Sequence, residues 1–418
     1  MRRHASVYHA KVRAFEFAIS LAELLPMLKV YTAVYLWKYR KTPDKRMGLF
    51  QHLLEVALSD NPNSGRPPRI WVERTQAMYL PAWLIDASVV ATAERITSSG
   101  VEPALATVAS QSSYFPGFSS EPLSCMALGA DLEDSVAVPF SDKLRQQFGQ
   151  EITCVPFMLA PFSLFSLWRL AGVMSITKNF RMDISSARAN MMAAYPVLVP
   201  VYLVEFRVNT GGETESYTVV CQAATLWSPY VIDDYIGLLA RDPAIARKPL
   251  HPFLPSPFLK GLRAMLSFAN LTCKVTSNTA TGIALSVSPR GVSAGLSYLI
   301  NSLGTMRGAT RAYEDMFFRR RDDPPGSGLS KPIDIDWDDL RIRPFTAEER
   351  RHNRLWTQLD AQVQRFRWFA ANGKVAKDKL PPVILQMAQS SRDMHEDARP
   401  EWLRQWHARP NKKDDGFT

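Results

Sequence analysis

The fold is decided by the stretch Val197–Val208, VLVPVYLVEFRV, in which apolar side chains recur at every second position. A period of two places alternate side chains on opposite faces of a β-strand, so this stretch predicts a strand with one apolar face. That face comprises Leu198, Tyr202, Val204, Phe206 and Val208. The other face turns polar at Glu205 and Arg207, so we expect the strand to emerge there toward solvent. The turn formers of Asn209–Glu213 and the alternating run Tyr217–Cys221 then predict a β-hairpin.

A second strand is predicted over Tyr79–Val90, YLPAWLIDASVV, which alternates in the same way. Leu80–Asp86 and Val199–Glu205 share one order of residue types: apolar, proline, small, aromatic, two apolar residues and an acid. A proline near the start of a strand is tolerated where no ladder needs its missing N–H. The shared order is compatible with an internal duplication.

The pair LPAW…D and VPVY…E, in this order, resembles a poorly characterised group of bacterial proteins in which a zinc ribbon precedes such strands. It is also similar to fungal proteins of unknown function, several of which are mitochondrial. The resemblance covers the two strands and the segment between them, and it implies a fold rather than an activity. The chain lacks the CxxC pairs of a zinc ribbon, so the resemblance implies no metal site and no functional residues here.

The composition is that of an ordinary globular protein, with 46% apolar and 22% charged residues in a chain of 418. These fractions exclude a largely disordered, collagen-like or disulfide-stapled chain. The net charge of +10 is concentrated at the ends: residues 1–46 hold 10 basic and 3 acidic side chains, residues 47–318 hold 20 and 21, and residues 319–418 hold 20 and 16. A nucleic-acid-binding protein normally carries its positive charge on the folded surface. The excess at the N-terminus therefore favours targeting.

The N-terminal segment predicts a mitochondrial protein. Arg2, Arg3, Lys11 and Arg13 all precede the first acid, Glu16, which is the composition of a transit peptide. We expect the protein in the matrix or on the matrix side of the inner membrane; the alternative is a basic first helix of the mature fold. The four cysteines are far apart in sequence, which favours reduced, mostly buried thiols over a zinc site.

The second half of the chain divides at Arg319–Gly328, where charged residues are followed by proline, glycine and serine. Thr346 and Glu349 then form a capping box at the start of a helix. The apolar face predicted for this helix comprises Leu355, Leu359, Val363, Phe366 and Ala370. Further helices are predicted after Pro381-Pro382 and around Trp402 and Trp406.

The predicted architecture is α+β, with a mainly antiparallel β body, packed helices and a helical C-terminal unit. The expected units are a targeting segment over 1–46, the body over 47–318, a linker over 319–340 and the C-terminal unit over 341–418.

Ser293 is the one candidate catalytic residue, because Gly291-Val-Ser-Ala-Gly295 matches the GxSxG pattern of a hydrolase nucleophile. Asp334 or Asp336 would supply the acid of a triad, and His352, His395 or His407 the base. The preceding residues do not form an apolar strand, which favours a glycine-rich helix or turn instead. The acids Asp334, Asp336, Asp338 and Asp339 could bind a hard cation, but exposed linker acids are the simpler interpretation. No cofactor is predicted.

The candidate contact residues lie on the first C-terminal helix, where arginines stand among aromatic residues in a pattern that could bind phosphates and stack on bases. They are Arg350, Arg351, Arg354, Arg365 and Arg367. The sequence therefore predicts a non-enzymatic mitochondrial protein that binds other macromolecules in assembly, scaffolding or ribosome-associated work. A protein partner is expected first and RNA or the ribosome second. Peripheral contact with a membrane is also compatible with the sequence. No small-molecule substrate is indicated, and a serine hydrolase using Ser293 is the alternative.

Overall fold

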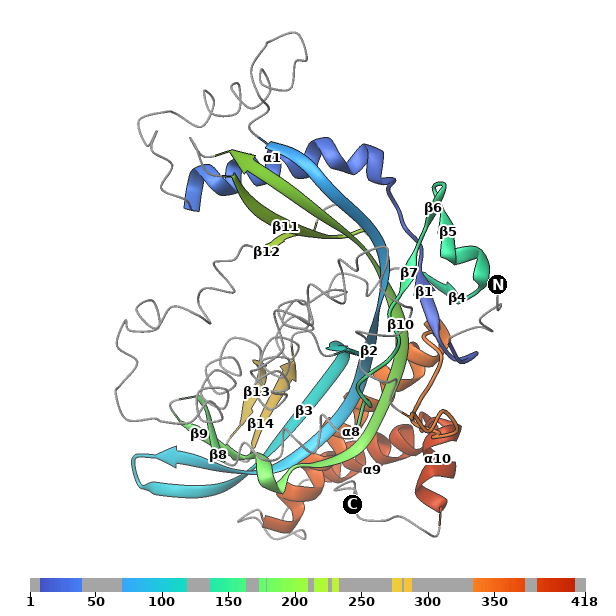
Figure 1. The fold of residues 1–418 in the computed structure, drawn as a ribbon. Helices are drawn as coiled ribbons and strands as arrows, with labels where there is room; N and C mark the ends of the chain where they lie inside the picture. Colours follow the sequence, from blue (N-terminus) through green and yellow to red (C-terminus); the bar gives the residue numbers. More distant parts are fainter. Residues whose placement is uncertain are drawn as a thin grey trace, which may run out of the picture.

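A computed structural model shows an α+β fold built on one mixed, mostly antiparallel sheet, which confirms the predicted fold class (Figure 1). It describes residues 8–39, 70–118, 136–162, 173–177, 179–209, 214–224, 228–232, 273–279, 282–287, 334–372 and 382–409. Along the sheet the strand order is β12 (Ser228–Ile232), β11 (Thr214–Gln222), β10 (Arg188–Asn209), β2 (Ile70–Thr97), β3 (Gly100–Pro116), β14 (Gly282–Val287) and β13 (Cys273–Thr279). The pair β3–β14 is parallel, and the other neighbours in this order are antiparallel.

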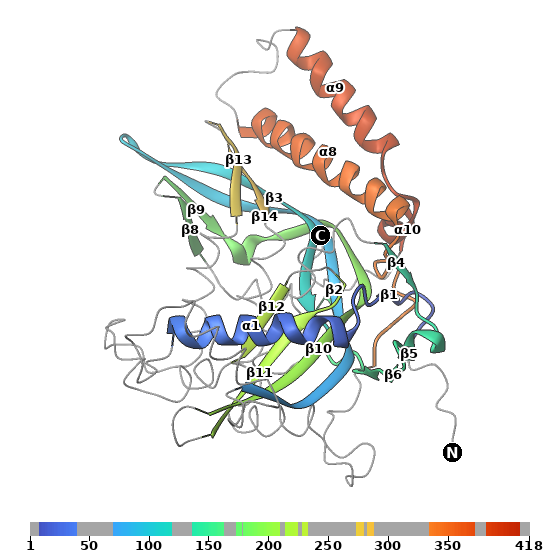
Figure 2. The same ribbon diagram turned by 90° about the horizontal axis from the view of Figure 1, so that it is seen from above.

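Shorter elements extend the sheet at its sides. They are β1 (Arg13–Phe15), β4 (Ala137–Pro139), β7 (Thr153–Cys154), β8 (Val173–Thr177) and β9 (Phe180–Asp183), with a separate hairpin of β5 (Gln146–Gln147) and β6 (Gln150–Glu151). The helices are α1 (Leu21–Tyr39), α8 (Ala347–Asn372), α9 (Pro382–Asp397) and α10 (Glu401–Ala408). Figure 2 shows α8 lying between α9 and the strands β2 and β3, while α1 crosses the region of β11 and β12.

The predicted strands and hairpin are both present. Asn209 pairs with Thr214 and Val201 with Gln222, so β10 and β11 form the expected hairpin. Phe206 is fully buried, as predicted. The strands are longer than their sequence patterns: β2 has 28 residues and β10 has 22. Both faces of β10 are covered along most of its length, because successive residues such as Leu203 and Val204 are fully buried.

The two prolines of the repeated pattern lie next to each other across the β2–β10 ladder, Pro81 opposite Leu198 and Pro200 opposite Tyr79. The carbonyl oxygen of Pro81 accepts from Gly117 N–H at 2.8 Å, and that of Pro200 accepts from Ala223 N–H at 2.8 Å. In an antiparallel strand the N–H and C=O of one residue point to the same side. Both missing N–H groups therefore face away from the ladder that joins β2 to β10, which is why prolines fit these long strands.

The described part of the predicted targeting segment belongs to the core. β1 runs parallel to β10, pairing Arg13 with Val197, and Val12, Ala14 and Phe15 are buried. The hydroxyl of Tyr8 donates to the carbonyl of Val155 at 2.5 Å. Targeting itself stays a prediction, but removal of residues 8–34 would take β1 from the sheet and buried side chains from the core.

The C-terminal helices start and end near their predicted limits. Thr346 Oγ1 accepts from Glu349 N–H at 3.3 Å, which is one half of the predicted capping box. The Glu349 carboxylate pairs with Arg343 instead of closing the other half. The last residues of the predicted linker, 334–340, also contact the body, because the ring of Trp337 packs against Trp83 of β2, with centroids 6.0 Å apart. The unit boundaries at 46, 318 and 340 stay predictions. None of the helices that the structure describes is both long enough and apolar enough to cross a membrane.

Candidate functional site: a buried polar network under α8

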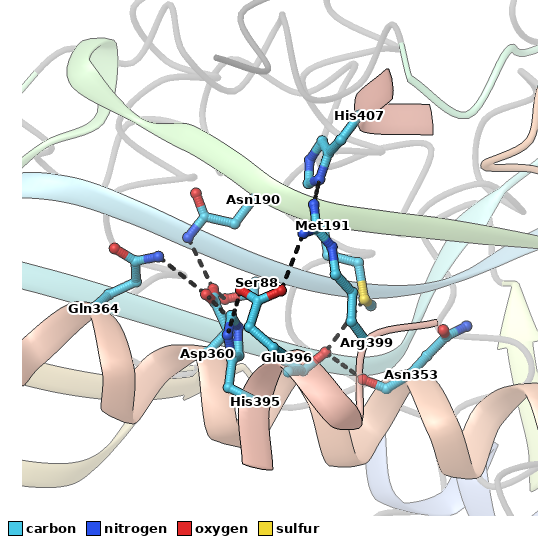
Figure 3. A network of polar contacts seen from close by, with 11 residues as sticks. Ser88, Asn190, Met191, Asn353, Asp360, Gln364, His395, Glu396, Arg399 and His407 are labelled. Carbon is cyan, nitrogen blue, oxygen red and sulfur yellow. Dashed lines mark hydrogen bonds and ion pairs between the residues drawn. The ribbon is translucent and has the colours of Figure 1, made fainter. Parts of the chain in front are cut away.

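The densest polar cluster of the described residues surrounds Asp360, at the contact between α8 and the sheet (Figure 3). Asp360 Oδ2 accepts from Ser88 Oγ of β2 at 2.5 Å and from Asn190 Nδ2 of β10 at 2.8 Å. Its Oδ1 accepts from Gln364 Nε2 at 3.0 Å and lies 3.2 Å from His395 Nε2 of α9. One carboxylate thus joins two strands and two helices.

The electrostatics of Asp360 follow from this surrounding. Its side chain is only 1% exposed, and burial on its own would raise the pKa of the carboxyl group. The contacts with His395, Ser88, Asn190 and Gln364 outweigh burial and lower the pKa of Asp360. The buried carboxylate is therefore ionised, and each of its neighbours offers it a hydrogen-bond donor.

A second chain of hydrogen bonds runs from α10 into the centre of the sheet. Trp402 Nε1 donates to Asn353 Oδ1 at 3.1 Å, and Asn353 Nδ2 donates to Tyr195 Oη at 2.7 Å. Tyr195 Oη then donates to Asp86 Oδ2 at 2.6 Å. These four side chains are buried, so every bond in the chain is shielded from water.

The Asp86 end of this series of hydrogen bonds stabilises an irregularity in the backbone of β3. The β2–β3 register shifts between Ile85 and Ala87, and Ser112 of β3 has a φ of 46°, which is unusual for a residue other than glycine. Asp86 Oδ1 accepts from the Ser112 N–H at 2.6 Å and so holds this conformation. Burial raises the pKa of Asp86, and the hydrogen bonds from Tyr195 and Ser112 oppose the shift.

Ser88, Asp360 and His395 are the residue types of a hydrolytic triad in a different order. In a triad the histidine lies between serine and acid and takes the serine proton. Here Asp360 lies between Ser88 and His395, and the Ser88 hydroxyl donates to the carboxylate. All three residues are also buried. The arrangement is thus suited to holding α8 and α9 on the sheet rather than to acyl transfer.

The candidate hydrolase residues are not brought together in what the structure describes. Ser293 lies outside the described residues. His395 contacts Asp360, His352 is exposed on α8, and His407 contacts Arg399. Asp336 accepts from the backbone of Asp338.

The predicted arginines differ in their contacts and exposure. Arg350 lies over the ring of Phe345 at 4.3 Å, Arg354 Nη2 donates to Ser112 Oγ at 3.1 Å, and Arg365 Nε donates to the carbonyl of Ala361 at 3.1 Å. These three are half-buried, and burial lowers the pKa of Arg365. Arg351 and Arg367 are exposed, but a turn of about 100° per residue places them about 160° apart around α8.

The predicted apolar face of α8 is partly wrong. Leu355 is 49% exposed, whereas Val363 is buried as expected. The face that meets the sheet instead carries a polar stripe at spacings of four, three and four, namely Asn353, Thr357, Asp360 and Gln364. Buried partners on the strands allow polar side chains there, since a hydrogen-bonded polar group is tolerated in a core. This spacing was the available sequence signal for the network.

The described acids and thiols show no metal-binding arrangement. No group of three or more His, Cys, Asp or Glu residues within the described ranges could hold a metal ion. In the predicted acidic cluster, Asp339 instead binds the guanidinium of Arg341, with Oδ2 2.7 Å from Nη2. Burial raises the pKa of Cys154 to about 11 and that of Cys221 to about 12, so both thiols are protonated at neutral pH.

No protein-family model, no curated protein and no solved structure matches this chain.

Proposed function

We propose that this chain is a non-enzymatic mitochondrial protein whose C-terminal helices present a rigid face to a protein partner. The observation that carries the proposal is the division of α8 into two opposite faces. Asn353, Asp360 and Gln364 bond inward, while Leu355 lies exposed on the outward side. A face that is fixed before binding loses less conformational entropy when a partner docks.

The outward face of α8 has a composition suited to a protein surface. It comprises Arg351, Leu355, Gln358 and Gln362, which are exposed and lie within about 60° around the helix axis. Exposed leucine beside arginine offers apolar contact together with a charged hydrogen-bond donor, and arginine is enriched at protein interfaces. The neighbouring helix α9 exposes Met394.

A protein partner is favoured over RNA by the contacts and the exposure of the arginines. Binding to phosphates uses several cations on one surface. Arg350 and Arg354 are engaged with Phe345 and Ser112, and Arg351 and Arg367 diverge around the helix. RNA or ribosome contact is therefore the second version of the proposal.

The test compares the partners of single-residue variants of the full chain. Deletion of 341–418 is unsuitable because it would remove the hydrogen-bond partners of Ser88 and Tyr195 in the sheet. Leu355→Glu should abolish co-purification of a specific mitochondrial protein after cross-linking. The matched control is Val101→Glu, since Val101 is similarly exposed but lies at the start of β3.

Three results would decide against this proposal. If Leu355→Glu kept the same cross-linked partners as the wild type, the outward face of α8 would not be the contact surface. Salt-sensitive retention of RNA by the wild type, weakened by Arg351→Gln, would replace a protein partner with RNA. Turnover of a generic ester substrate that is lost in Ser293→Ala would establish the hydrolase alternative instead.

A further inference from the structure

Two halves of the described sheet are related by an approximate two-fold axis that passes between β2 and β10. The repeated pattern of residue types places Leu80 and Val199 at equivalent positions, and these two residues pair directly with each other. Pro81 and Pro200 lie one position beyond this pair, each in its own strand. β2 forms a hairpin with β3, and β10 forms one with β11. Because β2 and β10 meet in the same register from either side, β2–β3 and β10–β11 are equivalent halves.

Two short strands that are far apart in the chain run beside these halves in equivalent places. β1 pairs in parallel with β10, and Arg13 lies opposite Val197. β7 pairs in parallel with β2, and Thr153 lies opposite Met78. Both partners lie two positions before the pair on the axis, so corresponding residues of the two segments are 140 positions apart. The buried side chains correspond in the same way: Val12, Phe15 and Phe17 in the first segment, and Ile152, Val155 and Phe157 in the second.

Each segment then makes the same backbone hydrogen bond at the end of a hairpin. The N–H of Ala18 donates at 2.7 Å to the carbonyl of Ala223, which directly follows β11. The N–H of Met158 donates at 2.7 Å to the carbonyl of Gly117, which directly follows β3. Residues 12–19, here the first clamp, precede β2 in the chain but hold the hairpin β10–β11. Residues 152–159, the second clamp, precede β10 but hold the hairpin β2–β3.

The aromatic contacts of the two clamps match as well. Phe17 packs against Tyr202 with ring centroids 5.0 Å apart and an angle of 53° between the planes. Phe157 packs against Trp83 with centroids 4.8 Å apart and an angle of 51°. Tyr202 Oη and Trp83 Nε1 each donate to the backbone carbonyl two positions after that phenylalanine, at 3.0 and 2.8 Å. Backbone pairing, aromatic packing and side-chain hydrogen bonding thus all repeat.

The match bears on the fate of the N-terminus, because the first clamp lies inside the predicted targeting segment. We infer that residues 12–19 are one of two equivalent clamps that interlock the halves of a duplicated fold, and that they stay in the mature protein, so that any cleavage by a processing peptidase falls before Tyr8. Tyr8 sets this limit because its hydroxyl donates to the carbonyl of Val155, inside the second clamp. The inference rests on the proposed function only for the import that would expose the chain to such a peptidase.

The N-terminus of the mature protein tests this inference. The full chain is expressed with a C-terminal tag in its own cells and purified from the mitochondrial fraction, and its first residue is determined by mass spectrometry of the intact protein and of its N-terminal peptide. We expect the mature chain to begin at or before Tyr8. A first residue beyond Tyr8 would overturn the inference. Absence of the protein from mitochondria would contradict the proposed function instead, and the variants below would then decide on the clamp.

Matched variants of the full chain test whether the two clamps are equivalent. Phe17→Ala and Phe157→Ala each remove a buried ring from one clamp, and each should lower the melting temperature by roughly 3–6 °C. The control is Glu16→Gln, an exposed neighbour in the first clamp, which should shift it by less than about 1 °C. If the alanine variants do not fold, Phe17→Leu and Phe157→Leu take their place. A Phe17 variant that melts with the wild type would refute the first clamp.

Discussion

Asn353→Ala tests whether the C-terminal helices and the sheet share one core. The substitution removes the amide that links Trp402 to Tyr195. The indole N–H of Trp402 is then left without an acceptor, and a buried unpaired donor costs about 1–3 kcal/mol. The hydroxyl of Tyr195 loses a donor, and the missing amide leaves a small void at the helix–sheet contact. We expect the free energy of unfolding to fall by about 2–4 kcal/mol.

Urea unfolding followed by circular dichroism and by tryptophan fluorescence measures this loss. The matched control is Gln358→Ala, five residues further along α8 on the outward face, which should change the free energy of unfolding by less than about 0.5 kcal/mol. A double-mutant cycle with Tyr195→Phe should give a coupling energy between about 0.5 and 3 kcal/mol, because the two side chains share one hydrogen bond.

The reasoning would be refuted if Asn353→Ala unfolded at the same urea concentration as Gln358→Ala. Strict additivity in the cycle with Tyr195→Phe would likewise show that helix and sheet are energetically independent. The C-terminal unit would then behave as the separate domain that the linker at 319–340 predicts.

Four further predictions concern other parts of the molecule. Phe206→Ala, at a fully buried position of β10, should lower the free energy of unfolding by about 3–5 kcal/mol, and an unchanged melting curve would contradict its place in the core. Phe148→Asn should raise stability by about 1 kcal/mol, because Phe148 and Gly149 both have positive φ in a two-residue hairpin turn; a lower melting temperature would oppose this. Because its contacts lower the pKa of Asp360, the stability that they provide is present above the unfolded pKa and lost on acidification. The difference in unfolding free energy between wild type and Asp360→Asn should thus shrink below about pH 4 in denaturation series. Residues 1–46 fused to a fluorescent reporter should direct it to mitochondria, and a diffuse cytosolic signal would contradict mitochondrial targeting.

The strands of this fold could be predicted because their signal is local. Alternation in Val197–Val208, followed by a glycine-containing turn, predicts a strand and a hairpin without knowledge of any partner. The helix at 347–372 follows in the same way from Thr346 and Glu349. Strand order is different, because it depends on pairings such as Leu285 with Val108 that no local pattern encodes.

The polar spacing on α8 indicates a buried polar face, but the partners of that face could not be predicted, because they are far apart from it in sequence. Ser88 and Asp360 are separated by 272 positions. A leucine such as Leu355 at helical spacing is assigned to the core by default, whereas Asp360 is assigned to the surface. In the structure Leu355 is exposed and Asp360 is buried. The buried carboxylate is tolerated because Ser88 and Asn190 donate hydrogen bonds to it. The chemistry of the cluster thus emerged only from the three-dimensional contacts.

The placement of β1 has a consequence for the order in which the chain folds. Arg13 pairs with Val197, and Lys11 donates to the carbonyl of Trp337, 326 positions later. Contacts between distant residues require long loops to close, which slows folding. During synthesis the first strand has no neighbour until β4 has been made, its pairing with β10 follows about 50 residues later, and its contact with Trp337 forms last. Until these partners are made, Lys11 and Arg13 are undocked, and this is the state that the proposed mitochondrial targeting requires.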